Sequence, residues 1–202
     1  FISTLLGFGL AIIVALMRIS DNKLYSVPAY SFIYLIRGTP LLLQLYFVYY
    51  GISQFSFVRE SFLWPILREP FWCGIITLTI STGAYSAEII RGGIQSVSQG
   101  YIESGKALGF GRISLFFRIV MPITIRQALP AYGNELILMV KASSLISIVT
   151  LMEITGIART IISKTYAPVE IFLVAGSIYL FINFIITRLV KYAENRLSIP
   201  ST

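Results

Sequence analysis

Residues 101–122, YIESGKALGFGRISLFFRIVMP, decide how this chain is interpreted, because they form a polar, glycine-rich stretch between two strongly apolar segments. Such a stretch is not expected inside a bilayer, where every backbone polar group needs a partner within the protein. We therefore expect it to leave the membrane and to contact another protein. The pattern within this stretch is an acid, two small residues, a glycine, an aliphatic residue and a proline. These are, in order, Glu103, Ser104, Gly105, Gly109, Ile119 and Pro122.

The composition indicates a membrane protein. Hydrophobic residues make up 56% of the 202-residue chain, and the mean hydropathy is +0.80. A soluble domain of this size has no place to bury so much apolar surface. The net charge of +7 indicates basic cytoplasmic loops rather than a nucleic-acid partner, because the basic residues lie between apolar segments and form no continuous patch.

The apolar segments predict an all-α integral membrane fold with five transmembrane helices in a single domain, residues 1–202. A helix needs roughly 20 mainly apolar residues to cross a bilayer. The expected spans are residues 1–17, 40–55, 71–90, 123–151 and 171–189. Phe1 is not a methionine and already lies in an apolar run, so we expect further residues upstream in the native protein.

The charges of the connecting segments predict the orientation. Three basic residues follow the first span, five surround the loop after the third span and three lie in the tail, so that eleven of sixteen share one side. The positive-inside rule makes that side cytoplasmic, with the N-terminus outside and the C-terminus inside. Residues 24–36 are predicted to form a helix at the membrane interface. We expect this helix to end sharply, because Pro40 favours an extended conformation at Thr39.

The stretch 101–122 resembles the coupling loop of binding-protein-dependent ABC importer permeases. That pattern is E-A-A, three residues, G, nine residues and I-x-L-P. Ser104 and Gly105 replace the two alanines, and Met121 replaces the leucine. The resemblance implies a cytoplasmic coupling loop at about 93–122 that contacts an ATPase, with Glu103 as a charged anchor or helix cap and Pro122 at the start of the next span. The alternative is an ordinary loop between two helices, in which glycine and proline are common.

Three further blocks resemble polar amino acid permeases of the same superfamily, so that the resemblance covers almost the whole chain. They are RGTPLLLQLY at 37–46, GAYSAEIIRGGIQSV at 83–97 and LPAYGNELILMVKASSL at 129–145. Together they are most similar to the branch that moves histidine, lysine, arginine and ornithine, or octopine and nopaline. The resemblance implies the type I importer permease architecture in a bacterial inner membrane.

The same resemblance implies partners and a substrate class. One chain would form half of a pathway in membrane lipid, beside a second permease subunit that is identical or paralogous. ABC ATPase subunits would dock on the cytoplasmic loops, and an extracytoplasmic solute-binding protein would deliver a basic or polar amino acid. The sequence contains no G-x-x-x-x-G-K-[ST] motif, so ATP hydrolysis is expected in a separate subunit. The lack of histidine and the single cysteine predict no enzyme activity, no metal and no cofactor.

Glu135 is the strongest candidate for a substrate-binding residue. It lies 12 residues past the predicted start of the fourth span, or roughly 18 Å along a helix, near the middle of a hydrocarbon core about 30 Å thick. An ionisable residue at that depth is costly and is functional by default. Weaker companions that carry hydrogen-bonding groups are Asn134, Gln44, Ser81 and Tyr85.

Alternatives remain open at this point. Glu135 is also suited to a structural ion pair with Arg91, Arg126 or Lys141, and hydroxyl groups commonly join transmembrane helices without binding a ligand. A secondary amino acid transporter without an ATPase partner would need a complete inverted repeat or several midplane carboxylates. A membrane-embedded enzyme would need a reactive cluster of side chains within the bilayer.

Overall fold

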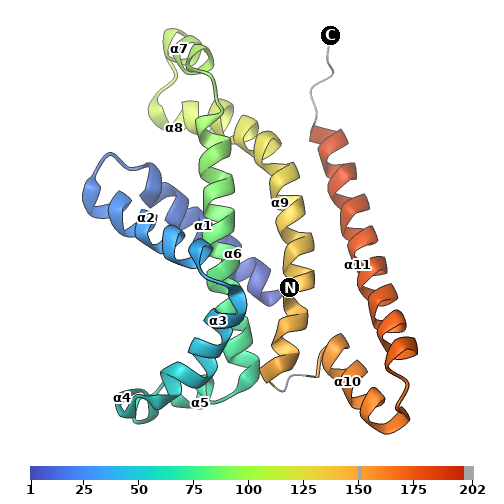
Figure 1. The fold of residues 1–202 in the computed structure, drawn as a ribbon. Coiled ribbons are helices and arrows are strands. Elements are labelled where there is room, and N and C mark those ends of the chain that lie inside the picture. Colours follow the sequence, from blue (N-terminus) through green and yellow to red (C-terminus); the bar gives the residue numbers. More distant parts are fainter. Residues whose placement is uncertain (150–151, 198–202) are drawn as a thin grey trace.

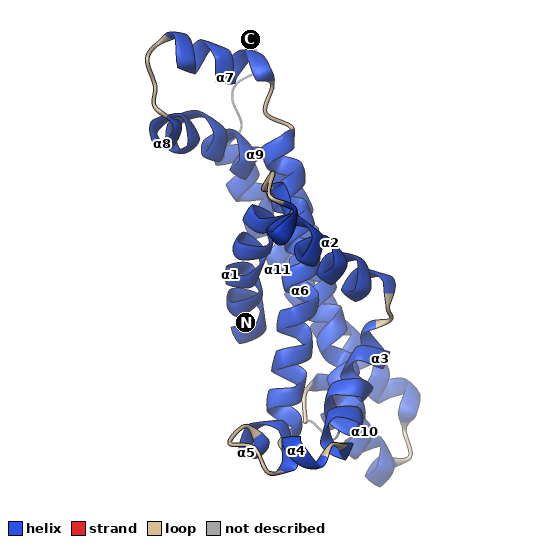
Figure 2. Cartoon of the chain, turned by 90° about the vertical axis from the view of Figure 1, so that its left-hand side faces the viewer, coloured by secondary structure: helices blue, strands red, loops and turns tan. Residues whose placement is uncertain are grey.

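Long helices run side by side through the molecule and carry short helices at both ends (Figure 1). The computed structural model describes residues 1–149 and 152–197, and every regular element in these two ranges is a helix (Figure 2). One end carries α7 (Gln99–Ala107) and α8 (Arg112–Leu115). The opposite end carries α4 (Ser56–Arg59), α5 (Trp64–Leu67) and α10 (Ile154–Thr165).

Four helical stretches in the described residues are long and apolar enough to cross a membrane. They are α1 (Ile2–Ile19), α6 (Pro70–Gln95), the continuous run Arg112–Val149 and α11 (Pro168–Leu197). The run contains α8, the π turn η3 (Phe116–Val120), α9 (Met121–Ser143) and the 3₁₀ turn η4 (Ser144–Val149). A bent pair of helices, Lys23–Gly38 and Leu41–Gln54, makes a fifth span if it is counted as one crossing. Its second part lies where the second span was predicted, and its first part lies where an interfacial helix was predicted.

The bent pair joins α2 (Lys23–Gly38) to the stretch Leu41–Gln54 at an angle of 104°. That stretch contains α3 (Leu41–Tyr46), the π turn η1 (Phe47–Gly51) and the 3₁₀ turn η2 (Ile52–Gln54). Pro40 holds Thr39 in an extended conformation, with φ −115° and ψ 142°. The Thr39 hydroxyl donates to Leu35 O at 2.9 Å, and Gln44 Nε2 donates to Ile36 O at 2.7 Å. These bonds satisfy carbonyl groups that the end of α2 would otherwise leave unpaired.

Small residues bring α1 and α6 into close contact. A Cβ atom at Gly7 would lie 2.8 Å from Thr82 Cβ, and a Cβ at Gly83 would lie 2.6 Å from Leu10 Cδ2. The neighbouring alanines at positions 11, 15, 84 and 87 are completely buried. Such positions favour association in a membrane, because small residues allow helix backbones to approach closely where lipid removes most of the hydrophobic driving force.

The start of the fourth span differs from the sequence prediction. Pro122 lies in the first turn of α9, as predicted, but the continuous helical run already begins at Arg112, before the predicted start of the span. Proline lacks the backbone N–H that a helix needs and crowds the carbonyl of the preceding turn. The π turn Phe116–Val120 lies directly before this position. We attribute the wider turn to Pro122, because a π turn accommodates a local break in the hydrogen-bond ladder.

The glycines of α1 provide a test of this packing. Gly7→Leu is expected to lower the amount of monodisperse protein extracted in detergent and to lower its melting temperature, because the new side chain meets Thr82 and Thr79 O. Overpacking of this kind costs about 1–3 kcal/mol. Gly9→Leu is the matched control, because no atom lies within 4 Å of a Cβ at that position. Equal behaviour of the two variants would contradict the proposed α1–α6 contact.

Candidate functional site

Glu135 lies on the face of α9 that packs against α6, and its side chain is 6% exposed. Met139, one turn further along the same face, accepts a hydrogen bond from the Thr82 hydroxyl of α6. Gly133 lies on the opposite face, where a Cβ atom would meet Val190 of α11 at 2.4 Å. The fold therefore turns the carboxylate of Glu135 away from α11 and toward the helices that form the centre of the subunit.

The Glu135 carboxylate makes no hydrogen bond or ion pair with any residue in the described ranges. Arg91, one of the candidate structural partners, is instead bonded to Glu88, with Nε 2.9 Å from Oε1. Among the described residues, Arg126 and Lys141 also form no ion pair with Glu135. Arg37, at the end of α2, stacks over Tyr85 of α6 and likewise forms no ion pair with Glu135 among the described residues. A buried carboxylate without a bonded partner is costly, so it is suited to a cationic ligand.

The other predicted binding residues lie in different environments. Ser81 is buried on α6, one turn before the half-buried Tyr85, whereas Asn134 is exposed on α9. Gln44 uses its amide nitrogen to hold the bend between α2 and α3, while its Oε1 is buried without a partner. Only an acceptor is therefore left on Gln44 for a ligand. The role of each of these residues in binding remains a prediction.

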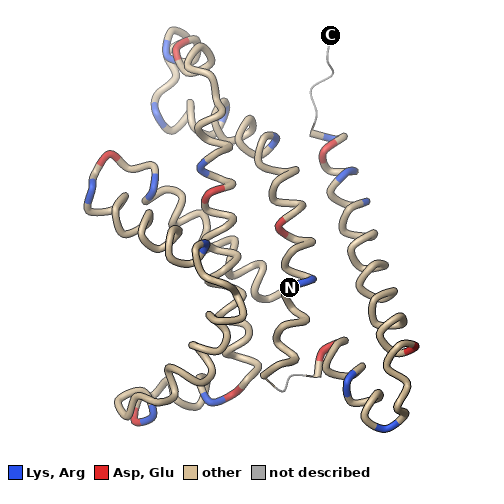
Figure 3. The backbone as a smooth tube through the Cα atoms, viewed as in Figure 1, with Lys and Arg blue, Asp and Glu red and all other residues tan. Residues whose placement is uncertain are grey.

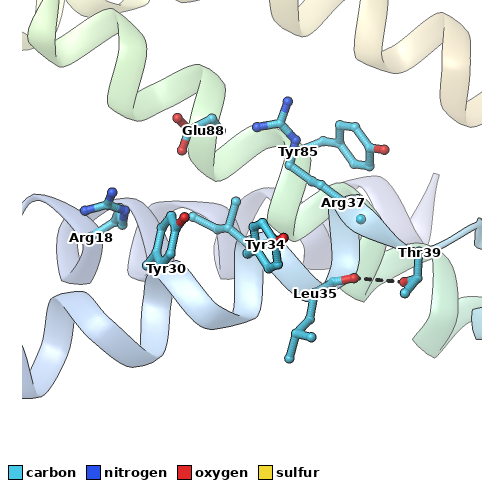
Figure 4. A pocket seen from close by; sticks show the side chains of 10 residues that line it. Arg18, Tyr30, Tyr34, Leu35, Arg37, Thr39, Tyr85 and Glu88 are labelled. Carbon is cyan, nitrogen blue, oxygen red and sulfur yellow. Dashed lines mark hydrogen bonds between the residues drawn. The ribbon is translucent and has the colours of Figure 1, made fainter.

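A pocket of about 540 Å³ lies between the end of α1, α2 and α6 (Figure 4). Arg37 places its Cζ atom 5.2 Å from the centre of the Tyr85 ring, and Arg18 lies 5.0 Å from the Tyr30 ring. Tyr85 is the one predicted binding residue that lines this pocket; the full lining is Arg18, Tyr30, Ile33, Tyr34, Leu35, Arg37, Gly38, Thr39, Tyr85 and Glu88. The sequence interpretation missed Arg18 and Arg37, because arginines beside a turn commonly extend to the membrane surface.

The segment between α6 and α8 forms a separate site at one end of the molecule, where α7 lies beside α8 (Figure 2). Gly105 is buried because α7 rests on the membrane helix at this point. A Cβ atom on Gly105 would lie 2.6 Å from Ile119 Cδ1 and 3.3 Å from Leu115 Cδ1. Two positions of the sequence pattern, Gly105 and Ile119, are therefore in direct contact. This contact explains the requirement for a small residue after Glu103.

Gly109 ends α7 in a left-handed conformation with φ +80°. Phe110 N donates to Gly105 O at 3.0 Å, and Gly109 N donates to Lys106 O at 2.9 Å. This pair of bonds is the Schellman motif, which favours glycine at its left-handed position. Arg118 then lies over the Phe110 ring at 5.6 Å, which fixes the returning chain. The glycine of the pattern thus determines the direction in which the loop returns to the membrane.

Glu103 and Ser104 lie on the exposed surface of α7. The expectation that Glu103 caps the helix is wrong, because α7 begins after Ser98 and Glu103 lies in its interior. A carboxylate there is free to contact another protein. Charged residues are spread over this end of the chain (Figure 3), and large apolar side chains are exposed beside them. Tyr101, Leu108 and Ile113 are 58%, 75% and 77% exposed.

The chain matches a known family along nearly its whole length. The family described as the binding-protein-dependent transport system inner membrane component covers residues 7–199. The nopaline transport system permease protein NocM of Agrobacterium fabrum is 55% identical over 96% of this chain and 81% of its own length. The histidine/lysine/arginine/ornithine transport system permease protein HisM of Escherichia coli K12 is 38% identical over 96% and 82%.

Solved structures have the same fold. A chain of an amino acid ABC transporter whose crystal structure contains histidines superposes with a TM-score of 0.86 at 34% identity, over 97% of this chain and 87% of that one. An inward-facing MetNI methionine ABC transporter gives a TM-score of 0.79 at 16% identity, over 98% and 91%, and supports the fold alone. The chain therefore belongs to the family of binding-protein-dependent transport system inner membrane components.

Proposed function

We propose that this chain is the permease subunit of an ATP-driven importer for amino acids that carry a cationic group. The observation that carries this proposal is the helix α7, which is exposed at one end of the molecule yet fixed to the long helical run through Gly105 and Ile119. A partner that moves α7 would move the run Arg112–Val149, and that run carries Glu135. The fold thus connects a docking surface to the interior of the membrane.

The partners follow from this arrangement and from the family. Two ABC ATPase subunits would dock on the α7 surfaces of two permease subunits, and an extracytoplasmic solute-binding protein would deliver the substrate from the other side. Each permease would supply half of the pathway. Closure of the ATPases would bring the two α7 helices together and reverse the side to which the pathway opens, because ATP favours one of two pre-existing states.

The substrate class is supported by Glu135 and by the relatives. The similar permeases belong to systems for nopaline, octopine, and histidine, lysine, arginine and ornithine. A cationic group beside Glu135 would offset the cost of burying its carboxylate. Asn134, Gln44, Ser81 and Tyr85 would contribute hydrogen bonds to the polar ends of the substrate. A secondary transporter is less well supported, because Glu135 is the one fully buried carboxylate in the described residues.

Gly105 provides a graded test of coupling. Gly105→Ala is expected to retain most transport, because the added methyl group meets only the flexible side-chain ends of Ile119 and Leu115. Gly105→Leu is expected to lower the amount of substrate imported per ATP hydrolysed by roughly tenfold, since overpacking of about 1–3 kcal/mol would displace α7. Both quantities are measured in proteoliposomes. Normal coupling by the leucine variant, in a fully assembled complex, would refute the proposed role of this contact.

The isolated chain is expected to hydrolyse no ATP. The physical reason is the absence from its sequence of the glycine-rich loop and lysine that hold nucleotide phosphates. Phosphate release by purified permease is measured with and without the ATPase subunits. Hydrolysis that stays with the permease through stringent purification would contradict a separate ATPase subunit.

Glu135→Gln is expected to lower uptake of arginine relative to glutamine by about tenfold or more, because a hydrogen bond to a charged group is worth roughly 1.5–3 kcal/mol. Competition uptake into proteoliposomes measures this ratio. Glu170→Gln is the control, because Glu170 is exposed at the start of α11. An unchanged ratio in a well-assembled Glu135 variant would remove this residue from the binding site, whereas a lower yield with unchanged selectivity would assign it a structural role.

A further inference from the structure

The pocket between α1, α2 and α6 contains many hydrogen-bond donors and few free acceptors. Arg18 and Arg37 line it, and neither forms an ion pair with a residue in the described ranges. Glu88 is the single carboxylate in the lining, and it is already bonded to Arg91. The three arginines and one glutamate together carry a net charge of +2. The positive charge of Arg18, which is half-buried, and of Arg37, which is exposed, therefore has no ion-pair partner among the described residues.

Two observations indicate that the missing partner is an anion. Arg18 Nε is buried and has no hydrogen-bond partner. A buried donor without a partner is costly, so it requires an explanation such as an absent ligand. The rings of Tyr30, Tyr34 and Tyr85 also line the pocket and bring phenolic hydroxyl groups to it (Figure 4). Guanidinium and hydroxyl groups are the donors that hold carboxylates in proteins.

The position of Arg37 connects this pocket to Glu135. Arg37 lines the pocket and stacks over Tyr85 of α6. Three residues before Tyr85, Thr82 bonds Met139 of α9, and because Gly93 lies beside Thr124 the two helices run in opposite directions. Glu135, one turn before Met139, therefore lies at about the level of Tyr85. Arg37 and Glu135 thus approach α6 at a similar level from α2 and α9, and the described residues show no ion pair between them. A zwitterion, with a carboxylate at one end and a cationic group at the other, would pair with both. A phospholipid phosphate would satisfy only the arginines.

We propose that Arg37, assisted by Arg18, binds the carboxylate of the substrate while Glu135 binds its cationic group. This inference rests on the proposed import of cationic amino acids and adds a specificity site for the opposite end of the molecule. Tyr85 would support the Arg37 guanidinium through its ring, which limits the rotation of the side chain and prepares it for a two-point contact. The 104° bend after α2 is what places Arg37 beside α6.

The test compares uptake of labelled L-arginine with uptake of labelled L-arginine amide, in which a neutral carboxamide replaces the carboxylate. The complete importer is reconstituted with its ATPases and solute-binding protein. The solute-binding protein can itself prefer arginine or the amide, but this preference is the same for every permease variant. It cancels when the arginine-to-amide uptake ratio of a variant is divided by that of the wild type. Arg37→Gln is expected to lower this ratio roughly tenfold or more, as for a lost bond between charged groups.

Two variants make the result specific. Arg37→Lys retains the charge and should assemble, but it loses the planar fork of donors, so an intermediate ratio is expected. Arg188→Gln is the matched control, because Arg188 also lies over an aromatic ring, at 5.0 Å from Phe184, but is not part of the pocket. The control should leave the ratio unchanged.

The possible outcomes separate this inference from the proposed function. If wild-type importer moves no arginine, the proposed substrate class fails and the carboxylate site fails with it. If wild type imports arginine but Arg37→Gln and Arg37→Lys leave the ratio unchanged, only the carboxylate site is overturned. If instead these variants alter transport only when phosphatidylglycerol replaces phosphatidylcholine in the liposomes, a lipid phosphate occupies the pocket and the inference is equally overturned.

Discussion

Close packing of α1 against α6 is the contact on which the rest of the structure depends. Glycine and alanine at the crossing let the two backbones approach, and the buried atoms of Thr82, Gly83 and Ala84 leave no space between them. Lipid is as apolar as the helix surfaces, so burial of apolar surface contributes little to helix association in a membrane. The close fit of α1 and α6 supplies the stability instead. Because α6 also packs against α2 and α9, it sets the positions of Arg37, Tyr85 and Glu135 relative to one another.

Local hydrogen bonds and close contacts explain the two irregular places in the fold, and both bear on the proposed function. At the bend after α2, Thr39 and Gln44 bond the free carbonyl groups, which permits a sharp turn within the membrane region. At the other irregular place, Gly109 ends α7 and the contact between Gly105 and Ile119 fixes it to the long helical run. The first feature positions the candidate binding residues, and the second positions the proposed docking surface.

The sequence predicted those features that depend on composition or on short-range geometry. Apolar length located the spans, and the glycine at position 109 indicated a turn that the structure confirms with a positive φ. Other features depend on distant contacts and could not be predicted in this way. The contact of Gly105 with Ile119 requires helical turns from Arg112 onward, before α9 begins at Met121 beside Pro122. The pocket of Arg18 and Arg37 requires the bend of 104°, whose size no local pattern determines.

The central claim is that this chain couples ATP hydrolysis on one side of a membrane to amino acid entry from the other. The most direct measurement is uptake of labelled arginine into proteoliposomes that hold the complete importer, with ATP and solute-binding protein each supplied on one chosen side. The account predicts concentrative uptake only when ATP is on the side of α7 and the binding protein is on the opposite side. Uptake that follows an imposed proton or sodium gradient, without ATP or the binding protein, would contradict it.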